Sequence, residues 1–261
     1  MTEPLHLQSR DNPLLVRLRR LAQDGNAYRR LGQVWLEGDH LCRALRARGA
    51  PAAQAVLTEQ AWADPQMRSL AAWAARVVVV PMDLFKGFSG LESPAGIGFV
   101  YDLPAPAALA PGVASVVLDR VQDAGNVGSI LRSAAAFGVR QVLSIKGTAA
   151  LWSPKVLRAG MGAHFALDLI EGLEPEALEQ LQVPTVATSS HAGHTLHTAA
   201  LPSPCAWVFG HEGQGVGELL LARCALQVRI DQPGGEESLN VAAAAAICLF
   251  ESARQVQGFV R

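Results

Sequence analysis

The sequence predicts an α/β protein with two domains, the second built on a mostly parallel sheet with helices on both faces. Three observations lead to this fold class. Half of the 261 residues are apolar, which is enough for a large core and for two domains. A proline-rich segment without charge divides the chain at residues 103–112. After it, apolar strands and helical segments alternate along the chain, as they do in parallel sheets.

The first 103 residues are expected to form a compact α/β unit. Four leucines between residues 14 and 21 recur at helical spacing with arginines on the opposite face, which predicts an amphipathic helix. Asp39 is a suitable N-terminal cap for a second helix that runs to Arg48. Short apolar runs predict strands at residues 34–36, 55–57, 77–80 and 96–101.

Residues 104–112 are the predicted linker, and residues 113–261 are the predicted second domain. Asn126 could cap the helix that follows the first strand of this domain. We expect strands at residues 113–118, 139–145, 165–169, 185–187, 206–209 and 225–230. We expect helices at residues 127–137, 154–162, 175–181, 217–222 and 239–255.

The charge of the chain is close to zero overall but uneven along its length. The formal net charge is −1, so the global balance does not mark a nucleic-acid binder. Residues 1–50 nevertheless hold nine arginines against five acidic residues, a local charge of +4. The planar guanidinium fork suits phosphate, and a GC-rich genome that favours arginine codons explains the same bias equally well.

The N-terminus, the apolar runs and the cysteines indicate the compartment. The N-terminal segment is polar and has no apolar core for export, and the longest apolar run, residues 241–250, is too short to span a bilayer. Cys42, Cys205, Cys224 and Cys248 form no C-x-x-C pair, which argues against a disulfide framework and against zinc held by cysteine. These features predict a cytoplasmic protein without a membrane partner.

Three loops of the second half each follow a predicted strand and carry glycines and polar residues. They read L-D-R-V-Q-D-A-G-N-V-G-S-I-L-R at residues 118–132, F-G-H-E-G-Q-G-V at 209–216, and I-D-Q-P-G-G-E-E-S-L-N-V at 230–241. In open parallel sheets, ligands bind beyond the carboxyl ends of the strands. Glycines let a ligand approach the backbone closely, because no Cβ stands in the way. The three loops therefore predict one ligand site.

Neither a dinucleotide fingerprint nor a metal cluster fits the sequence well. The G-x-G-x-x-G pattern is absent, because the first loop has only Gly125 and Gly128 and the second reads G-x-x-G-x-G. The spacing of His191, His194 and His197 invites a metal interpretation, but no acidic residue or cysteine adjoins them, and the intervening glycine indicates a loop. No metal site is predicted.

The three loops, in this order, resemble the motifs of the SpoU (TrmH-like) family of RNA ribose 2′-O-methyltransferases. The first motif, N-x-G-x-x-x-R, is matched by Asn126, Gly128 and Arg132. The second, a G-x-E-G-x-G loop, is matched by Gly210, Glu212, Gly213 and Gly215. The third, which ends in S-L-N-V, is matched by Ile230, Gly234, Ser238, Leu239, Asn240 and Val241. The resemblance covers roughly residues 113–255.

The resemblance implies a fold and an activity. It implies the SPOUT superfamily, with a C-terminal methyltransferase domain tied in a deep trefoil knot that binds S-adenosylmethionine. It also implies a homodimer whose active sites are completed across the interface. The first half resembles the family's L30e-like substrate-binding domain, since a basic helix precedes W-L-E-G at residues 35–38. The implied reaction is methylation of a ribose 2′-hydroxyl in structured RNA.

The resemblance also implies roles for individual residues. The implied catalytic residues are Arg132, Asn126, Glu212, Ser238 and Asn240, and the implied cofactor contacts are Gly210, Gly213, Ile230, Gln232 and Leu239. Arg132 would either take the proton of the 2′-hydroxyl or, as a cation, clamp an RNA phosphate. Read without the resemblance, Glu212 could be a carboxylate at a helix N-terminus, and Ser238 and Asn240 could be simple helix caps.

One departure from the family's motifs and two alternative functions remain. Asp231-Gln232 stands where the family usually has Pro-Met, so the Asp231 carboxylate would add negative charge near the cofactor.

The two-domain plan favours ribosomal RNA over transfer RNA as the substrate. A non-catalytic knotted RNA-binding protein is the rival from another class, and the intact Asn126 and Arg132 argue against it.

Overall fold

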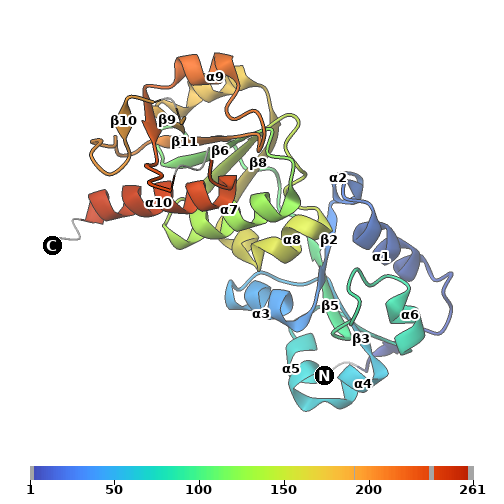
Figure 1. Cartoon of the computed structure of the whole chain (residues 1–261). Coiled ribbons are helices and arrows are strands. Elements are labelled where there is room, and N and C mark those ends of the chain that lie inside the picture. The colour runs from blue at the N-terminus through green and yellow to red at the C-terminus, as the bar shows by residue number, and fades with distance from the viewer. Residues whose placement is uncertain (1–2, 191, 235–237, 258–261) are drawn as a thin grey trace. The chain divides into compact units, whose positions relative to one another are not determined.

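The computed structural model describes residues 3–190, 192–234 and 238–257, and the chain forms two compact units (Figure 1). The first comprises Met1–Ala105 and Trp152–Phe165, and the second comprises Pro106–Leu151 and Ala166–Arg261. The break after Ala105 falls inside the predicted linker. Residues 152–165, expected in the second domain, pack with the first unit instead. No helix in the described part of the chain is long and apolar enough to cross a membrane.

A mixed sheet forms the centre of the first unit. Its strands are β1 (Leu5–His6), β2 (Gln33–Glu37), β3 (Gln54–Thr58), β4 (Val77–Val80) and β5 (Ile97–Asp102). Their order is β1-β4-β3-β5-β2, in which β4 is parallel to both of its neighbours and β5 is antiparallel to both of its own. Gly98 of β5 faces Trp35 of β2 so closely that a Cβ there would collide with the indole ring.

The helices around this sheet are mostly short. They are α1 (Pro13–Gln23), α2 (Ala27–Leu31), α3 (Asp39–Ala47), α4 (Glu59–Ala63), α5 (Pro65–Ala71), α6 (Met82–Lys86) and α8 (Pro154–Gly160), and the 3₁₀ helix η1 (Ala163–Ala166) follows α8. Asn12 caps α1, since its side chain accepts a hydrogen bond from the Leu14 N–H at 2.9 Å. Leu15, Leu18 and Leu21 are buried, which confirms the predicted amphipathic helix.

The second unit is built on a sheet in which every strand pair is parallel. Its strands are β6 (Ser115–Asp119), β7 (Gln141–Ile145), β8 (Asp168–Leu173), β9 (Thr185–Thr188), β10 (His194–Thr195), β11 (Ala206–Gly210) and β12 (Leu226–Arg229). Their order is β10-β12-β9-β11-β6-β7-β8. This confirms the predicted parallel sheet. All residues of β6, β7 and β11 are buried, as expected for strands covered on both faces.

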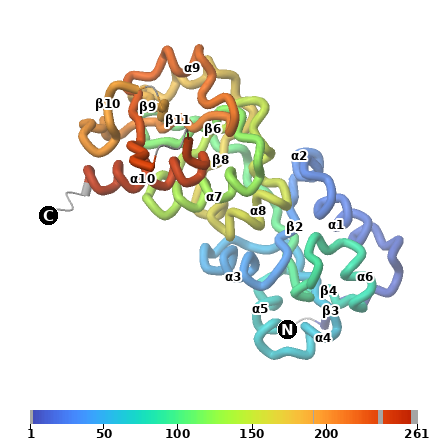
Figure 2. The backbone as a smooth tube through the Cα atoms, in the orientation of Figure 1, coloured from blue at the N-terminus to red at the C-terminus, as the bar shows by residue number. Residues whose placement is uncertain are grey.

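Helices cover both faces of this sheet (Figure 2). On one face, α7 (Ala124–Ala136) and α10 (Val241–Gln257) pack side by side, and on the other lie η2 (Pro175–Leu181) and α9 (Glu218–Arg223). Side chains of β11 alternate between the two faces. Trp207 donates from Nε1 to Ser252 Oγ of α10 at 2.8 Å, whereas Val208 packs against Leu178 of η2 and Leu220 of α9.

The start of α7 differs from the prediction. Asn126 was expected to cap this helix, but the cap is Asp123, whose Oδ1 accepts a hydrogen bond from the Asn126 N–H at 2.7 Å. The helix therefore begins at Ala124, three residues earlier than predicted. Because Asn126 lies inside the first turn and is not needed as a cap, its side-chain amide is available for other partners.

Candidate active site

The carboxyl ends of the parallel strands bring the three predicted loops to one edge of the second sheet. β6 and β11 are neighbours, and β9 alone separates β11 from β12 in the strand order. The loops that follow β6, β11 and β12 therefore leave the sheet on the same side, where open α/β sheets bind their ligands.

Three side chains, one from each loop, form a hydrogen-bonded chain. Glu212, in the loop after β11, accepts a hydrogen bond from Asn126 Nδ2 at 3.2 Å. Asn126 in turn accepts one from Asn240 Nδ2 at 2.9 Å, across a sequence separation of 114 residues. Three of the five predicted catalytic residues are thus brought together in a Glu212–Asn126–Asn240 network.

Glu212 also binds its loop to the beginning of α7. Its carboxylate accepts hydrogen bonds from the backbone N–H groups of Gln122 at 3.2 Å and Asp123 at 3.0 Å. Partial burial acts to raise the pKa of Glu212, but these bonds and the one from Asn126 outweigh it, so the pKa lies below its ordinary value. Glu212 is therefore a carboxylate at a helix N-terminus as well as a motif residue, although the helix is α7 and not the α9 that follows it.

Arg132 lies on the exposed side of α7, six residues after Asn126. Within the described residues, its guanidinium takes part in no hydrogen bond and no ion pair. The guanidinium of an arginine is a cation in proteins. Arg132 therefore offers a full positive charge and a planar set of N–H donors to an incoming anion.

The loop after β11 folds back onto Gly210. His211 and Gly215 exchange backbone hydrogen bonds at 3.0 and 2.8 Å, and Gly215 has a φ of 68°, which suits glycine. A Cβ on Gly210 would collide with the backbone of Gly215 and Val216. His211, which the sequence did not single out, shapes the turn, since its Nδ1 accepts a hydrogen bond from the Gly213 N–H at 3.0 Å.

The third loop ends as the cap of α10. Asn240 Oδ1 accepts hydrogen bonds from the N–H groups of Ala242 at 2.9 Å and Ala243 at 3.3 Å, so Asn240 is a cap in addition to its bond with Asn126. Ser238 and Leu239 are exposed just before the helix. Residues 235–237 of this motif lie outside the described residues.

Asp231 and Gln232, which stand where the family usually has Pro-Met, have different surroundings. Asp231 was expected to place a negative charge near the cofactor, but its carboxylate lies 3.1 Å from Arg229 Nε and 3.5 Å from His197 Nδ1, so a basic partner offsets its charge. Gln232 is half-buried, and within the described residues its Oε1 is buried without a hydrogen-bond partner. An orphaned acceptor of this kind suits a ligand that brings an N–H donor.

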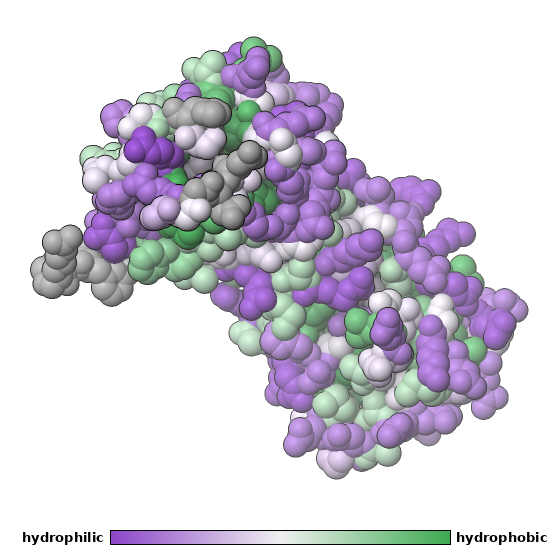
Figure 3. Space-filling model, in the orientation of Figure 1, coloured by the Kyte–Doolittle hydropathy of each residue, from purple (hydrophilic) through white to green (hydrophobic). Residues whose placement is uncertain are grey.

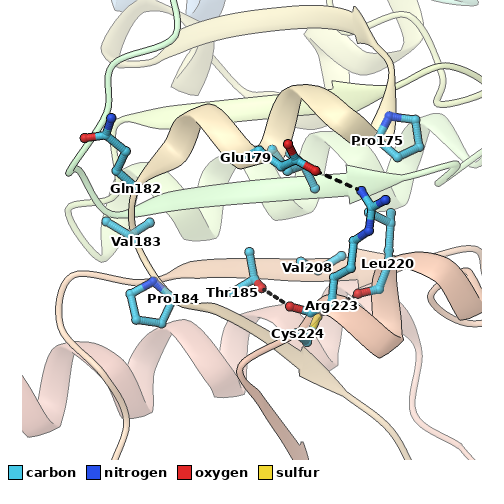
Figure 4. A pocket seen from close by; sticks show the side chains of 11 residues that line it. Pro175, Glu179, Gln182, Val183, Pro184, Thr185, Val208, Leu220, Arg223 and Cys224 are labelled. Carbon is cyan, nitrogen blue, oxygen red and sulfur yellow. Dashed lines mark hydrogen bonds and ion pairs between the residues drawn. The ribbon is translucent and has the colours of Figure 1, made fainter.

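An apolar cavity of this unit lies away from these loops. A cavity of about 340 Å³ sits between η2 and α9 near the amino end of β9, lined by Leu178, Thr185, Val208, Leu220 and Cys224 (Figure 4). Arg223 and Glu179 form an ion pair of 3.5 Å across it. None of the predicted site residues lines this cavity, so it is not part of the site at the carboxyl edge.

Comparison with known proteins identifies the family. The model of the SpoU rRNA Methylase family matches residues 114–250, which is more than half of the chain. The chain belongs to the SpoU rRNA methylase family. The resemblance inferred from the three loops is thereby confirmed, and so is the prediction of an RNA methyltransferase with an α/β fold.

Members of the SpoU family are similar to the chain over different lengths. An uncharacterized tRNA/rRNA methyltransferase of Synechocystis is 32% identical over 95% of this chain and 93% of its own. The 23S rRNA (guanosine-2′-O-)-methyltransferase RlmB of Bordetella pertussis is 36% identical, over 55% of this chain and 60% of its own. The structure of an AdoMet-bound rRNA methyltransferase from Sinorhizobium meliloti is 25% identical, with a TM-score of 0.83 over 98% of both chains.

Proposed function

We propose that the chain methylates the 2′-hydroxyl of a ribose in ribosomal RNA, with S-adenosylmethionine as the methyl donor. The observation that carries this proposal is the Glu212–Asn126–Asn240 network, which joins all three SpoU motif loops beside the exposed Arg132. Relatives named as 23S rRNA 2′-O-methyltransferases support the reaction and the class of RNA.

The residues at the carboxyl edge fit S-adenosylmethionine. The turn at Gly210 brings backbone to where a side chain would otherwise stand, and Gln232 Oε1 is a buried acceptor without a partner in the described chain. The adenine of the cofactor has an amino group that can donate to such an acceptor. We propose that Gly210, Gly213, Ile230, Gln232 and Leu239 hold the cofactor, which supplies an electrophilic methyl group.

Arg132 is proposed to act as a cation and not as a base. Its guanidinium is exposed and makes no hydrogen bond or ion pair within the described residues, so its charge is free to bind an anion. A guanidinium can bind a phosphate through two N–H groups and so fix the adjacent ribose. Correct orientation of the hydroxyl is itself a large part of the rate enhancement in such transfers. Asn126 and Glu212 would then keep α7, and with it Arg132, in register with the cofactor loops.

The exposed side of α10 supports a homodimer. Ile247 and Phe250, three residues apart and so on one face of the helix, are 41% and 53% exposed, and Figure 3 shows apolar surface along this helix. Large apolar side chains grouped on one helix face mark an interaction surface. We propose that α10 packs against a second copy. Sedimentation of Phe250→Asp should show a monomer where the wild-type protein is a dimer, and an unchanged mass would contradict this interface.

Two further features of the family stay proposals. We propose that the C-terminal segment forms the trefoil knot that the family resemblance implies. The arginine-rich first unit is proposed to bind RNA as an L30e-like domain. Arg30 and Arg43 pair with Asp24 and Asp39, so the RNA contacts would fall to other arginines. A cytoplasmic site of action agrees with an RNA substrate and with the four free cysteines.

One experiment tests the reaction and its substrate together. The protein is incubated with methyl-labelled S-adenosylmethionine and with either rRNA or tRNA that lacks modification, and the labelled nucleotide is mapped. We expect label on a ribose 2′-oxygen of rRNA. Label on tRNA alone would replace rRNA as the substrate, label on a base would overturn the reaction, and a failure to bind the cofactor at all would favour a non-catalytic RNA-binding protein.

A further inference from the structure

An ion pair between Asp119 and Arg120, outside the motif residues, lies at the carboxyl end of β6; Asp119 is buried and the Arg120 side chain is 34% exposed. Asp119 is the last residue of β6, and only 2% of it is exposed. Its carboxylate is bound by Arg120 through Nε at 2.9 Å and Nη2 at 3.1 Å, and it accepts a hydrogen bond from the Gly217 N–H at 2.7 Å. A buried carboxylate is costly unless it is paired and hydrogen-bonded, and this one is satisfied by both means.

The backbone at Arg120 is strained in a way that makes the pairing possible. Side chains of neighbouring strand residues point to opposite faces, so Arg120 would ordinarily turn away from Asp119. Its φ of 58° lies in the left-handed region, which is unfavourable for a residue with a Cβ, and it folds the guanidinium back onto the carboxylate. Thr148 holds this conformation, since its Oγ1 accepts from the Arg120 N–H at 3.0 Å and donates to the Leu118 carbonyl at 2.9 Å.

The ion pair reaches the loop after β11 at two points. Asp119 holds the loop where it ends, at the Gly217 N–H, and Arg120 Nη1 donates to Gln214 Oε1 in its middle at 3.3 Å. Glu212, in the same loop, is fixed from the other side by the N–H groups before α7. The loop whose backbone folds over Gly210 is therefore anchored to β6 by one charged pair.

We propose that Asp119 and Arg120 are positioning residues that set the 210–217 loop for cofactor binding and Glu212 for its bond with Asn126. This inference rests on the proposed function of the same site. Neither residue needs to touch the reacting atoms, because each acts through the loop that it holds. Strain at a non-glycine residue is kept where surrounding bonds over-determine it, and functional sites are where such strain collects.

Arg120→Gly is the most informative variant, because glycine adopts a positive φ without strain while the whole arginine side chain, guanidinium included, is removed. We expect the dissociation constant for S-adenosylmethionine, measured by calorimetry without RNA, to rise about tenfold. Arg223→Ala, which removes an exposed ion pair near the distant cavity of the same unit, is the matched control and should leave cofactor affinity unchanged. Arg120→Lys keeps the charge but loses the planar fork, and an intermediate affinity is expected.

The possible results distinguish a failure of the positioning role from a failure of the proposed function. If the wild-type protein does not bind S-adenosylmethionine, the proposed function fails. If the wild-type protein binds it and Arg120→Gly binds equally well, the positioning role is wrong. If Arg120→Gly does not fold, Arg120→Lys decides, because wild-type affinity in that variant would overturn the role. The melting temperature of Arg120→Gly should fall, because Asp119 is left buried without its cation. Weaker cofactor binding measured below that transition, with partial recovery in Arg120→Lys, supports the positioning role.

Discussion

The two ends of the parallel sheet in the second unit contrast in chemistry. At the carboxyl edge, Glu212, Asn126 and Asn240 share hydrogen bonds across three loops. Toward the amino end of β9, a cavity of about 340 Å³ is lined largely by apolar side chains such as Leu178 and Leu220. The polar side chains and backbone N–H groups that meet at the carboxyl ends of the strands belong to the proposed site, and the apolar cavity lies apart from it.

The largest effect is expected at the carboxyl edge from Arg132→Ala. Loss of the cation that positions the substrate should lower the single-turnover rate of RNA methylation by about 10³-fold. Cofactor affinity should stay at the wild-type value, because Arg132 is not among the proposed cofactor contacts. Arg223→Ala, at the cavity, should keep at least half of the wild-type rate. A variant of Arg132 that lost cofactor affinity but kept turnover would contradict its assignment.

Gly210→Ala should produce the next largest effect. The added methyl group would collide with the backbone of Gly215 and Val216, so the loop must shift and cofactor affinity should fall by about 10²-fold. Gly193→Ala is the control, because a Cβ at Gly193 meets no atom within 4 Å. Calorimetric titration of both variants with S-adenosylmethionine measures the difference, and equal affinities would remove Gly210 from the cofactor site.

Glu212→Gln should have a smaller effect that also depends on pH. We expect a rate about tenfold lower at neutral pH, because a neutral amide binds the Gln122, Asp123 and Asn126 donors less strongly than a carboxylate. Since hydrogen bonds lower the pKa of Glu212 in the folded protein, its contribution to stability is present above its ordinary value of 4.5 and is lost as the pH falls through the lower folded value.

Urea unfolding at pH 7 and near pH 3.5 measures this contribution directly. The difference in free energy of unfolding between wild type and Glu212→Gln should be larger at pH 7 than in acid. A difference that does not change with pH would mean that the charge of Glu212 contributes nothing to holding the loop.

The smallest effect on catalysis is expected at the cavity. Leu220→Ala removes a side chain that is 6% exposed and should lower the free energy of unfolding by about 2–3 kcal/mol. The methylation rate below the melting transition should remain within about twofold of wild type, because the lesion lies away from the carboxyl edge. Denaturant titration and rate measurements on the same preparation test both statements. A large loss of methylation rate in Leu220→Ala would mean that the cavity end of the sheet also contributes to catalysis.

The sequence was sufficient to predict the sheet of the second unit for a physical reason. Strands of a parallel sheet are covered on both faces, so segments such as residues 206–210 are unbroken apolar runs. Between these runs lie helical segments whose polar and apolar residues alternate at helical spacing. The two-residue strand β10 and the five-residue helices α2, α4 and α6 were not predicted, because they are too short to show a period.

The site was predictable as three loops but not as a network. Asp123 and Asn126 are both good caps, and the sequence alone could not show that the first caps α7 while the second turns to Glu212. The pair of Asp119 and Arg120 depends on a left-handed φ and on partners about 95 residues away, neither of which leaves a local pattern. Their position beside the first motif, at a strand end, is the signal that could have drawn attention to them.

The bond between Asn126 and Asn240 has a consequence for how the protein is made. These residues are 114 positions apart, and at a synthesis rate of roughly 5–20 residues per second Asn126 is added to the chain about 6–23 seconds before Asn240. During that interval α7 can form with its Asp123 cap, but the network cannot close. Cofactor binding should therefore begin only after the chain has been synthesised beyond Asn240 and α10 has left the ribosome.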